Sequence, residues 1–94
     1  MADIEFEWDE RKSRVNKRKH GISFDEAQTV FLDENAIRYD DPDHSRNEDR
    51  FIMLGLSIRL RVLIVCHCYR SDDMIIRIIL ARKATKSEAA AYWR

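Results

Sequence analysis

The run MIIRIILARKATKSE, residues 74–88, is the stretch of sequence on which the fold depends. Its first half is rich in isoleucine and leucine, which is typical of a β-strand in a core, and we expect a strand at about 73–83. Arg77 interrupts the apolar residues and Arg82 closes them. Because a guanidinium is buried only with a partner, these two arginines need either internal carboxylates or a ligand.

Two more strands precede this one, and short links join all three. We expect them at about 50–57 and 59–70, where aliphatic and aromatic residues dominate. Because links of so few residues connect antiparallel neighbours, the three strands should form an antiparallel meander. After the meander, Thr85 and Glu88 have the spacing of a capping box, which predicts a terminal helix.

The first part of the chain predicts one strand, two helices and a short second strand. The expected elements are a strand at 4–8, a helix at 10–20, a helix from Ser23 to about Leu32, and a strand at 36–39. Asp9 is a favourable N-cap for the first helix, and Gly21 is the residue expected just past its end. Ser23 and Glu26 have the spacing of a second capping box. Residues 1–94 should therefore form a single α+β domain, a curved antiparallel sheet packed against two N-terminal helices with a short C-terminal helix.

Length and charge limit the classes of function. The 94 residues fit one domain, and no apolar run is long enough to span a bilayer. Because the N-terminus also lacks the pattern of a secretory signal, we expect a soluble, cytoplasmic protein. The net charge is +0, but residues 11–20 are mostly basic and residues 33–49 mostly acidic. This distribution predicts two partners of opposite charge.

The strand at 59–70 separates its side chains into two rows, as alternation along a strand requires. One row is Arg61, Leu63, Val65, His67 and Tyr69, and the other is Leu60, Val62, Ile64, Cys66 and Cys68. The second row is entirely apolar, so we expect it to face the core. The first row, with Arg77 from the next strand, would then lie on an open face.

Such an open face suits RNA. Arginines bind phosphate oxygens, an imidazole moves protons near neutral pH, and a tyrosine stacks on an unpaired base. Cleavage by attack of the 2′-hydroxyl on the adjacent phosphorus needs a base, an acid and a positive stabiliser, without a metal or another cofactor. On the helix at 10–20, Lys12 and Lys19 lie on one side and could reach a groove.

Each of these residues also has an ordinary structural interpretation. Arg77 could pair with a nearby acid, His67 could be a core residue, and Lys12 and Lys19 could belong to a solvated helix face. His20 could interact with the helix dipole. Cys66 and Cys68 are interpreted as core thiols rather than as metal or redox ligands, because a zinc site needs about four converging ligands.

The order of the residues resembles that of the BrnT family, small ribonuclease toxins of bacterial toxin–antitoxin pairs. The stretch FEWDERKSRVNKRKHGISFDEAQTVF resembles the opening of the family. The middle, with Glu48-Asp49-Arg50-Phe51, Gly55 and Arg61, and the end, RIILARKA with Glu88 and Tyr92, follow in the same order. The resemblance covers almost the whole chain.

This resemblance implies a RelE-like fold and an endoribonuclease that needs no metal and inhibits translation. It also implies a cognate BrnA-like antitoxin that carries a DNA-binding domain. The expected assembly is a 2:2 heterotetramer, and operator DNA is contacted only through the antitoxin. A catalytically inactive, toxin-like module that acts by binding protein or DNA is the alternative.

Site residues follow from the resemblance as expectations. The catalytic residues are expected to be Arg61, His67, Arg77 and Arg82, and the RNA-binding residues Lys12, Lys19, His20 and Tyr69. No metal ligand is expected. The chain departs from the family at two places, since the family usually has Ser where this chain has Leu80, and often has Thr-Glu-Arg at residues 68–70. A missing hydroxyl at position 80 would weaken activity if that hydroxyl takes part in catalysis.

Overall fold

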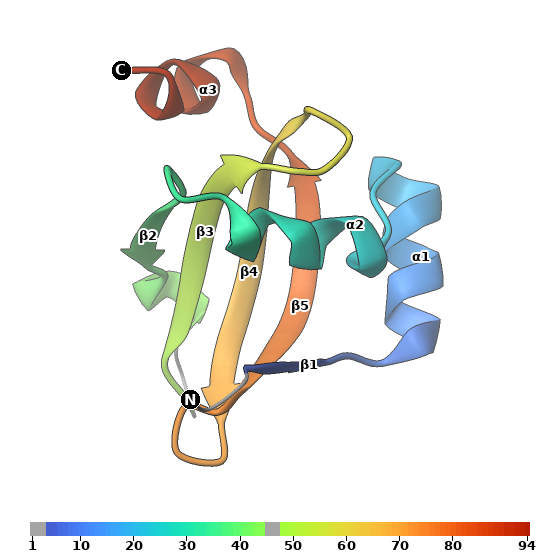
Figure 1. The fold of residues 1–94 in the computed structure, drawn as a ribbon. Coiled ribbons are helices and arrows are strands. Elements are labelled where there is room, and N and C mark those ends of the chain that lie inside the picture. Colours follow the sequence, from blue (N-terminus) through green and yellow to red (C-terminus); the bar gives the residue numbers. More distant parts are fainter. Residues whose placement is uncertain (1–3, 45–47) are drawn as a thin grey trace.

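The computed structural model describes residues 4–44 and 48–94, which form one five-stranded sheet with helices around it (Figure 1). In chain order the elements are β1 (Glu5–Glu7), α1 (Glu10–His20), α2 (Phe24–Gln28), the 3₁₀ helix η1 (Thr29–Leu32), β2 (Ile37–Asp40), the 3₁₀ helix η2 (Pro42–His44), β3 (Arg50–Leu56), β4 (Val62–Arg70), β5 (Ile75–Lys83) and α3 (Lys86–Tyr92). The predicted α+β fold class is confirmed. No helix in the described part of the chain is long and apolar enough to cross a membrane.

The strand order is β1-β5-β4-β3-β2. Strands β2 to β5 pair antiparallel, as the short links predict. Strand β1 joins the edge of β5 in parallel, so the sheet is mixed rather than purely antiparallel. A parallel edge strand is possible here because α1, α2 and the rest of the chain lie between β1 and β5 and provide the long connection that parallel pairing needs.

Local sequence signals explain where the helices begin and end. The Asp9 carboxylate accepts hydrogen bonds from the first backbone N–H groups of α1, and Gly21 ends that helix at a φ of 76°. The Ser23 hydroxyl caps α2, but Glu26 does not complete the predicted capping box. Its carboxylate binds Arg61 instead. The capping box of Thr85 and Glu88 is complete and starts α3.

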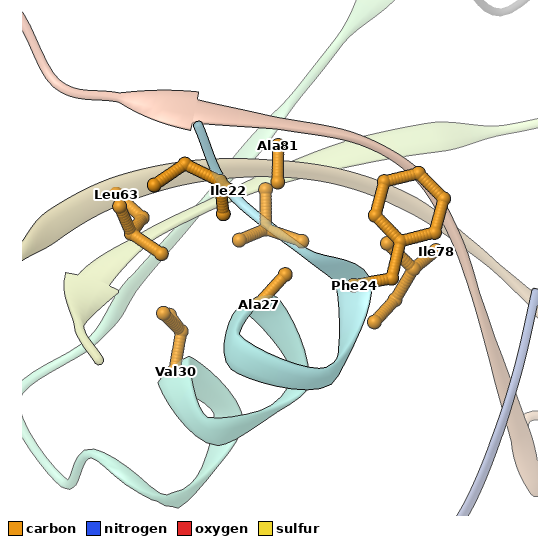
Figure 2. Close-up of a cluster of buried hydrophobic side chains, with 8 residues drawn as sticks. Ile22, Phe24, Ala27, Val30, Leu63, Ile78 and Ala81 are labelled. Carbon is orange, nitrogen blue, oxygen red and sulfur yellow. The ribbon is translucent and has the colours of Figure 1, made fainter. Parts of the chain in front are cut away.

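The main core lies between α2 and one face of the sheet (Figure 2). It consists of Ile22, Phe24, Ala27, Val30, Leu63, Val65, Ile78 and Ala81. Gly55 of β3 belongs to this contact, because a Cβ atom there would lie 2.8 Å from Val30 and 2.9 Å from Ala36. The element α3 packs against the opposite face, where Tyr92 contacts Leu54 and Ile64.

The second row of the strand at 59–70 contributes core residues, as predicted, but the expectation that the first row lies on an open face is wrong. The helix-covered row contains Leu63 and Val65, both 0% exposed, whereas Ile64 and Cys68 are buried on the other face. The assignment failed because β4 has apolar residues in both rows and buries both of them. Leu60 is not in the strand at all and is 78% exposed in the β3–β4 turn.

The β3–β4 turn holds Leu60 in a left-handed conformation with a φ of 62°. Its N–H donates to the Ser57 carbonyl at 2.8 Å, which closes the turn. A residue with a Cβ costs about 1–2 kcal/mol in this conformation, and glycine avoids that cost but loses roughly 0.5–1 kcal/mol of backbone entropy. We therefore expect Leu60→Gly to raise the free energy of unfolding by up to about 1 kcal/mol in urea denaturation.

Ile58 provides the matched control for this substitution. It lies in the same turn and is 74% exposed, but its φ is not positive. Ile58→Gly should lower the free energy of unfolding, because glycine there brings only its entropy cost. Equal losses for the Leu60→Gly and Ile58→Gly variants would show that the backbone of Leu60 is not strained.

Candidate functional site

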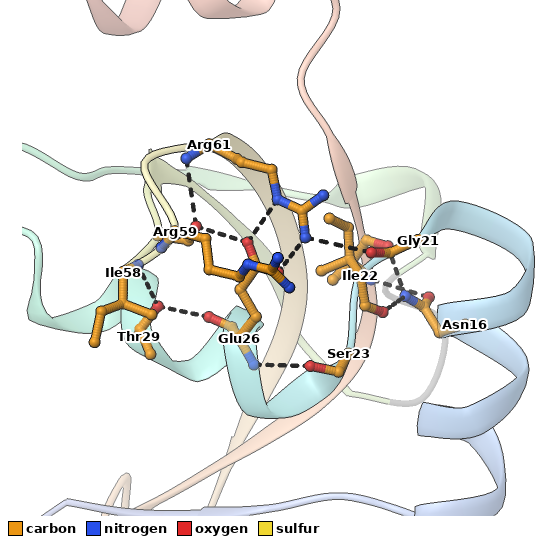
Figure 3. A network of polar contacts seen from close by, with 11 residues as sticks. Asn16, Gly21, Ile22, Ser23, Glu26, Thr29, Ile58, Arg59 and Arg61 are labelled. Atoms are coloured by element: carbon orange, nitrogen blue, oxygen red, sulfur yellow. Dashed lines mark hydrogen bonds and ion pairs between the residues drawn. The ribbon is translucent and has the colours of Figure 1, made fainter.

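Arg61 lies in a polar network that joins α2 to the β3–β4 turn (Figure 3). Its Nη2 and Nε donate to both carboxylate oxygens of Glu26, the Nε bond at 2.9 Å, and the Ser57 hydroxyl donates to Glu26 at 2.7 Å. Burial raises the pKa of Glu26, but the bonds from Arg61 and Ser57 outweigh it, so this pKa lies below its ordinary value. Arg61 thus neutralises a carboxylate whose side chain is only 5% exposed.

His67 points into the helix-covered side of the sheet and is 0% exposed. Its Nδ1 lies 3.1 Å from the Val65 carbonyl oxygen, and its ring packs edge-on against Phe31 at a centroid distance of 4.8 Å. Within the described residues, Nε2 is buried without a hydrogen-bond partner. The predicted grouping of Arg61, His67, Tyr69 and Arg77 on one open face is therefore wrong, and the catalytic roles of Arg61 and His67 stay predictions.

Burial of His67 predicts a loss of stability at low pH. Burial lowers the pKa of His67 below its ordinary value, although the bond to Val65 acts in the opposite direction, and the nearby Arg38 charge also lowers it. The unfolded chain then takes up a proton at a higher pH than the folded protein. We expect the free energy of unfolding to fall as the pH drops below about 6.5.

Urea denaturation at about pH 7.5 and about pH 5.5 checks this expectation. The His67→Phe variant keeps an aromatic ring among Phe31, Phe51 and Tyr69 but cannot be protonated, so it should lose part of the pH dependence. His20→Gln, a change on a half-exposed side chain of α1, should keep it. A pH dependence in His67→Phe as large as in the wild type would contradict this interpretation.

The face of the sheet turned away from α2, hereafter the open face, contains Arg77 and Arg82. Arg77 is paired with Cys68 of β4 and Arg82 with Ile64, so both point to the same side. Arg77 has an odd number and Arg82 an even one, so regular alternation along β5 would place them on opposite faces. The pairing of β4 with β5 shifts by one residue between Cys66 and His67, however, and leaves Ile79 as an extra residue, a β-bulge, in β5. This bulge brings the two predicted arginines together on the open face.

Carboxylates hold both arginines in place. Arg77 donates from Nη1 to Glu7 at 2.8 Å, and Arg82 binds both oxygens of Glu88 at 2.8 and 2.9 Å. The bonds from Arg82 are the largest cause that lowers the pKa of Glu88 to about 2. Arg70 joins the same face at 3.5 Å from Glu7. The arginines are one-third to one-half exposed, so their remaining N–H donors can reach a ligand.

A groove of about 460 Å³ separates α1 from β5 and adjoins the open face at Leu80. This α1–β5 groove is lined by Asp9, Arg11, Lys12, Val15, Asn16, Lys19, His20, Ile79 and Leu80. The Asp9 carboxylate accepts from the Lys12 backbone N–H, which is the largest cause that lowers its pKa; the charges of Lys12 and Arg77 lower it further. The predicted residues Lys12, Lys19 and His20 thus line one groove, and Arg77 lies outside its lining but close enough to Asp9 to lower the pKa of that carboxyl.

Asn16 fixes the position of α1 beside β5. Its Nδ2 donates to the carbonyl oxygens of Ile22 and Ala81, both at 2.8 Å, and its Oδ1 accepts from the Ala81 N–H at 3.2 Å. The amide therefore satisfies edge groups of β5 that a neighbouring strand would otherwise bind. In the sequence, Asn16 falls on the same side of the predicted helix as Lys12 and Lys19, and this position was the available signal for its role.

Tyr69 lies in a different place from Arg77 and Arg82. It points to the helix-covered side of the sheet, where its ring packs against Phe51 and its hydroxyl accepts from Arg38 at 3.3 Å. A hollow of about 430 Å³ here also contains three carboxylates, from Glu48, Asp49 and Asp73. The structure therefore does not bring Tyr69 to the open face, and its predicted stacking on RNA stays a prediction.

The two cysteines are free thiols; Cys68 is buried, as predicted, whereas Cys66 is half-buried. Burial and the hydrogen bond to Asp41 raise the pKa of Cys66 to about 12, which disfavours the thiolate form. In the residues described, His, Cys, Asp and Glu nowhere form a group of three that could hold a metal ion.

Comparisons with known proteins give both a family and a fold. The family model described as "Ribonuclease toxin, BrnT, of type II toxin-antitoxin system" matches residues 8–88. Among solved structures, the crystal structure of the Brucella abortus ribonuclease toxin BrnT matches with a TM-score of 0.64 and 22% sequence identity, over 92% of this chain and 100% of that one. At this identity the likeness shows a shared fold. A search among curated proteins gave no match.

Proposed function

The chain belongs to the family of BrnT ribonuclease toxins of type II toxin–antitoxin systems, and from this premise we propose that it cleaves RNA on the open face of the sheet. The observation that carries the proposal is the bulge in β5, because it brings Arg77 and Arg82 to one side. The α1–β5 groove, which reaches the open face at Leu80, adds Lys12, Lys19 and His20. These five side chains provide a cationic surface of the kind that a phosphate backbone requires.

Each group has a distinct part in the proposed reaction. The 2′-oxygen bonds to phosphorus, the bond from phosphorus to the 5′-oxygen breaks, and water takes the proton of the 2′-hydroxyl and protonates the departing 5′-oxygen. Arg77 and Arg82 donate to the non-bridging oxygens of the scissile phosphate and stabilise the negative charge that develops in this step. Lys12, Lys19 and His20 hold the neighbouring phosphates. Glu7 and Glu88 keep the two guanidiniums oriented, because each carboxylate already binds one of them.

Finer points follow from the family and are proposals for this chain. We propose that cleavage needs no metal ion and that it inhibits translation. We also propose that an antitoxin with a DNA-binding domain neutralises the toxin in a 2:2 complex and connects it to operator DNA. The chemistry above supports metal independence, since fixed guanidiniums provide the positive charge that a metal would otherwise provide.

One alternative has an observation in its favour. The guanidiniums of Arg77 and Arg82 are each engaged by a carboxylate, and Leu80 between them offers no hydroxyl. A toxin-like module that only binds its partners would have such a neutralised face. The two functions differ in one measurable property, the cleavage of RNA by the isolated protein.

The deciding experiment incubates the purified, antitoxin-free chain with end-labelled RNA, with and without EDTA. We expect cleavage in both conditions and products that end in a 2′,3′-cyclic phosphate or its hydrolysis product. Complete inhibition by EDTA would contradict metal independence. A folded protein that leaves RNA intact, while its Leu80→Ser variant cleaves it, would favour the binding module and assign the difference to the hydroxyl.

A further inference from the structure

The lining of the α1–β5 groove combines aliphatic side chains, hereafter its floor, with cationic side chains, hereafter its rim. Its floor is formed by Val15, Ile79 and Leu80, of which Val15 is 44% and Leu80 37% exposed. Its rim contains Arg11, Lys12, Lys19 and His20. Asp9 is the one acid in this lining, and its carboxylate already caps α1. The groove therefore offers exposed apolar surface under an excess of positive charge.

Binding of RNA would explain why the rim of the groove is cationic, but not why its floor is aliphatic. Phosphates bind cations, and unpaired bases stack on aromatic rings or on guanidinium planes. The floor residues Val15, Ile79 and Leu80 have neither. A groove of this kind is complementary to an amphipathic protein segment whose aliphatic side chains enter the floor while its carboxylates reach the rim.

We infer that the α1–β5 groove is the docking site of an acidic, amphipathic segment of the antitoxin protein. This inference rests on the proposed function, because a type II toxin has a protein antitoxin as its partner. The charge of the groove identifies the segment as rich in Asp or Glu, and its floor requires aliphatic residues spaced to lie on one side of that segment.

The groove is formed before any partner binds. Asn16 joins α1 to Ala81 of β5 through two hydrogen bonds, so the two walls have a fixed separation. A preformed site avoids the free-energy cost of ordering, which favours tight association. The rim residues that we propose to contact the RNA backbone are Lys12, Lys19 and His20. An acidic segment bound to the same rim would therefore exclude RNA from it.

Val15→Ser tests this inference with Leu32→Ser as its matched control. Val15 lies on the floor and has no part in the proposed RNA contacts, whereas Leu32 is an aliphatic residue, 79% exposed, that lines a different hollow. The antitoxin protein that forms a pair with this chain is titrated into each purified variant by calorimetry. We expect Val15→Ser to weaken its Kd about tenfold or more and Leu32→Ser to leave it unchanged. The Lys12→Glu/Lys19→Glu variant should weaken binding of both antitoxin and RNA.

The possible outcomes separate this inference from the proposed function. Unchanged antitoxin affinity in Val15→Ser, or a loss in Leu32→Ser, would place the docking site elsewhere and overturn the inference. Weaker RNA binding with unchanged antitoxin binding in Val15→Ser would assign the groove to RNA and overturn it as well. If the wild type does not cleave RNA, while Val15→Ser alone weakens the antitoxin complex, the ribonuclease proposal fails and the docking site stands.

Discussion

Replacement of Arg61 by alanine is expected to lower the free energy of unfolding by about 3 kcal/mol. The reason is Glu26, whose buried carboxylate would lose the bonds from Arg61 Nε and Nη2. An isolated buried charge costs far more than the net contribution of the intact pair, so the large effect comes from the partner left behind. Because Arg61 itself is 27% exposed, water will replace some of the lost donors and moderate the loss.

Two comparisons identify the cause of this loss in urea denaturation. Arg59→Ala removes an exposed arginine from the same turn and should change the free energy of unfolding by less than about 0.5 kcal/mol. In a Glu26→Gln background the charge is gone, so Arg61→Ala should cost less than half as much as in the wild type. Equal costs in the two backgrounds would show that the buried charge is not the cause.

The same variants separate a structural role of Arg61 from a catalytic one. If Arg61 only stabilises the fold, RNA cleavage per folded molecule should be the same in Arg61→Ala as in the wild type at low temperature. A large loss of cleavage in fully folded Arg61→Ala would support the catalytic role that the family resemblance predicts for it.

Alanine at Arg77 or at Arg82 is expected to reduce the rate of RNA cleavage about 100-fold or more while the protein stays folded. Removal of one preorganised donor to a developing charge costs about 10²–10³ in rate. The stability loss should be small for Arg77→Ala, because partly exposed ion pairs such as Arg77–Glu7 contribute about 0–1 kcal/mol. It should be larger for Arg82→Ala, since Arg82 binds both oxygens of Glu88, but smaller than for Arg61→Ala. Alanine at Arg77 or Arg82 should therefore reduce the rate of cleavage more than the stability, whereas Arg61→Ala should mainly reduce the stability.

Cleavage assays at saturating RNA, together with circular dichroism, check this second prediction. Arg14→Ala is the matched control, because Arg14 is exposed on α1 and does not line the α1–β5 groove. Arg77→Lys should recover only part of the activity, since an ammonium group lacks the planar set of donors of a guanidinium. Arg77→Ala and Arg82→Ala variants that are folded and as active as Arg14→Ala would exclude both arginines from the reaction.

The helix ends and the strand meander could be predicted because their causes are local. Asp9, Gly21 and the capping box of Thr85 and Glu88 act within a few residues of each other, so the sequence contains the whole signal. The same holds for the antiparallel pairing of β3, β4 and β5, which short links impose.

The grouping of the site residues could not be predicted because its causes are not local. Both rows of β4 contain buried apolar residues, so alternation alone could not show that Leu63 and Val65, rather than Ile64 and Cys68, face α2. The bulge at Ile79 reverses the side to which Arg82 points, and the pattern IIRIIL contains no residue that demands it.

The long-range ion pairs could not be predicted from the sequence either. Glu26 and Arg61 are joined across the fold, as are Glu7 and Arg77, and these partners can be recognised only when the sheet is assembled. The aliphatic floor of the α1–β5 groove likewise depends on how Asn16 docks α1 against β5.

The most direct test of the account is to map where RNA lies on the folded protein. A short RNA with 2′-O-methyl riboses cannot be cleaved by attack of a 2′-hydroxyl, so it can be titrated into the isotope-labelled chain and followed by NMR. An RNA site on the open face predicts shifts of the backbone amide signals at residues 77–82 of β5 and 12–20 of α1, with little change at Glu26, Arg61 and Tyr69. Shifts concentrated at Glu26, Arg61 and Tyr69, with β5 unaffected, would contradict it.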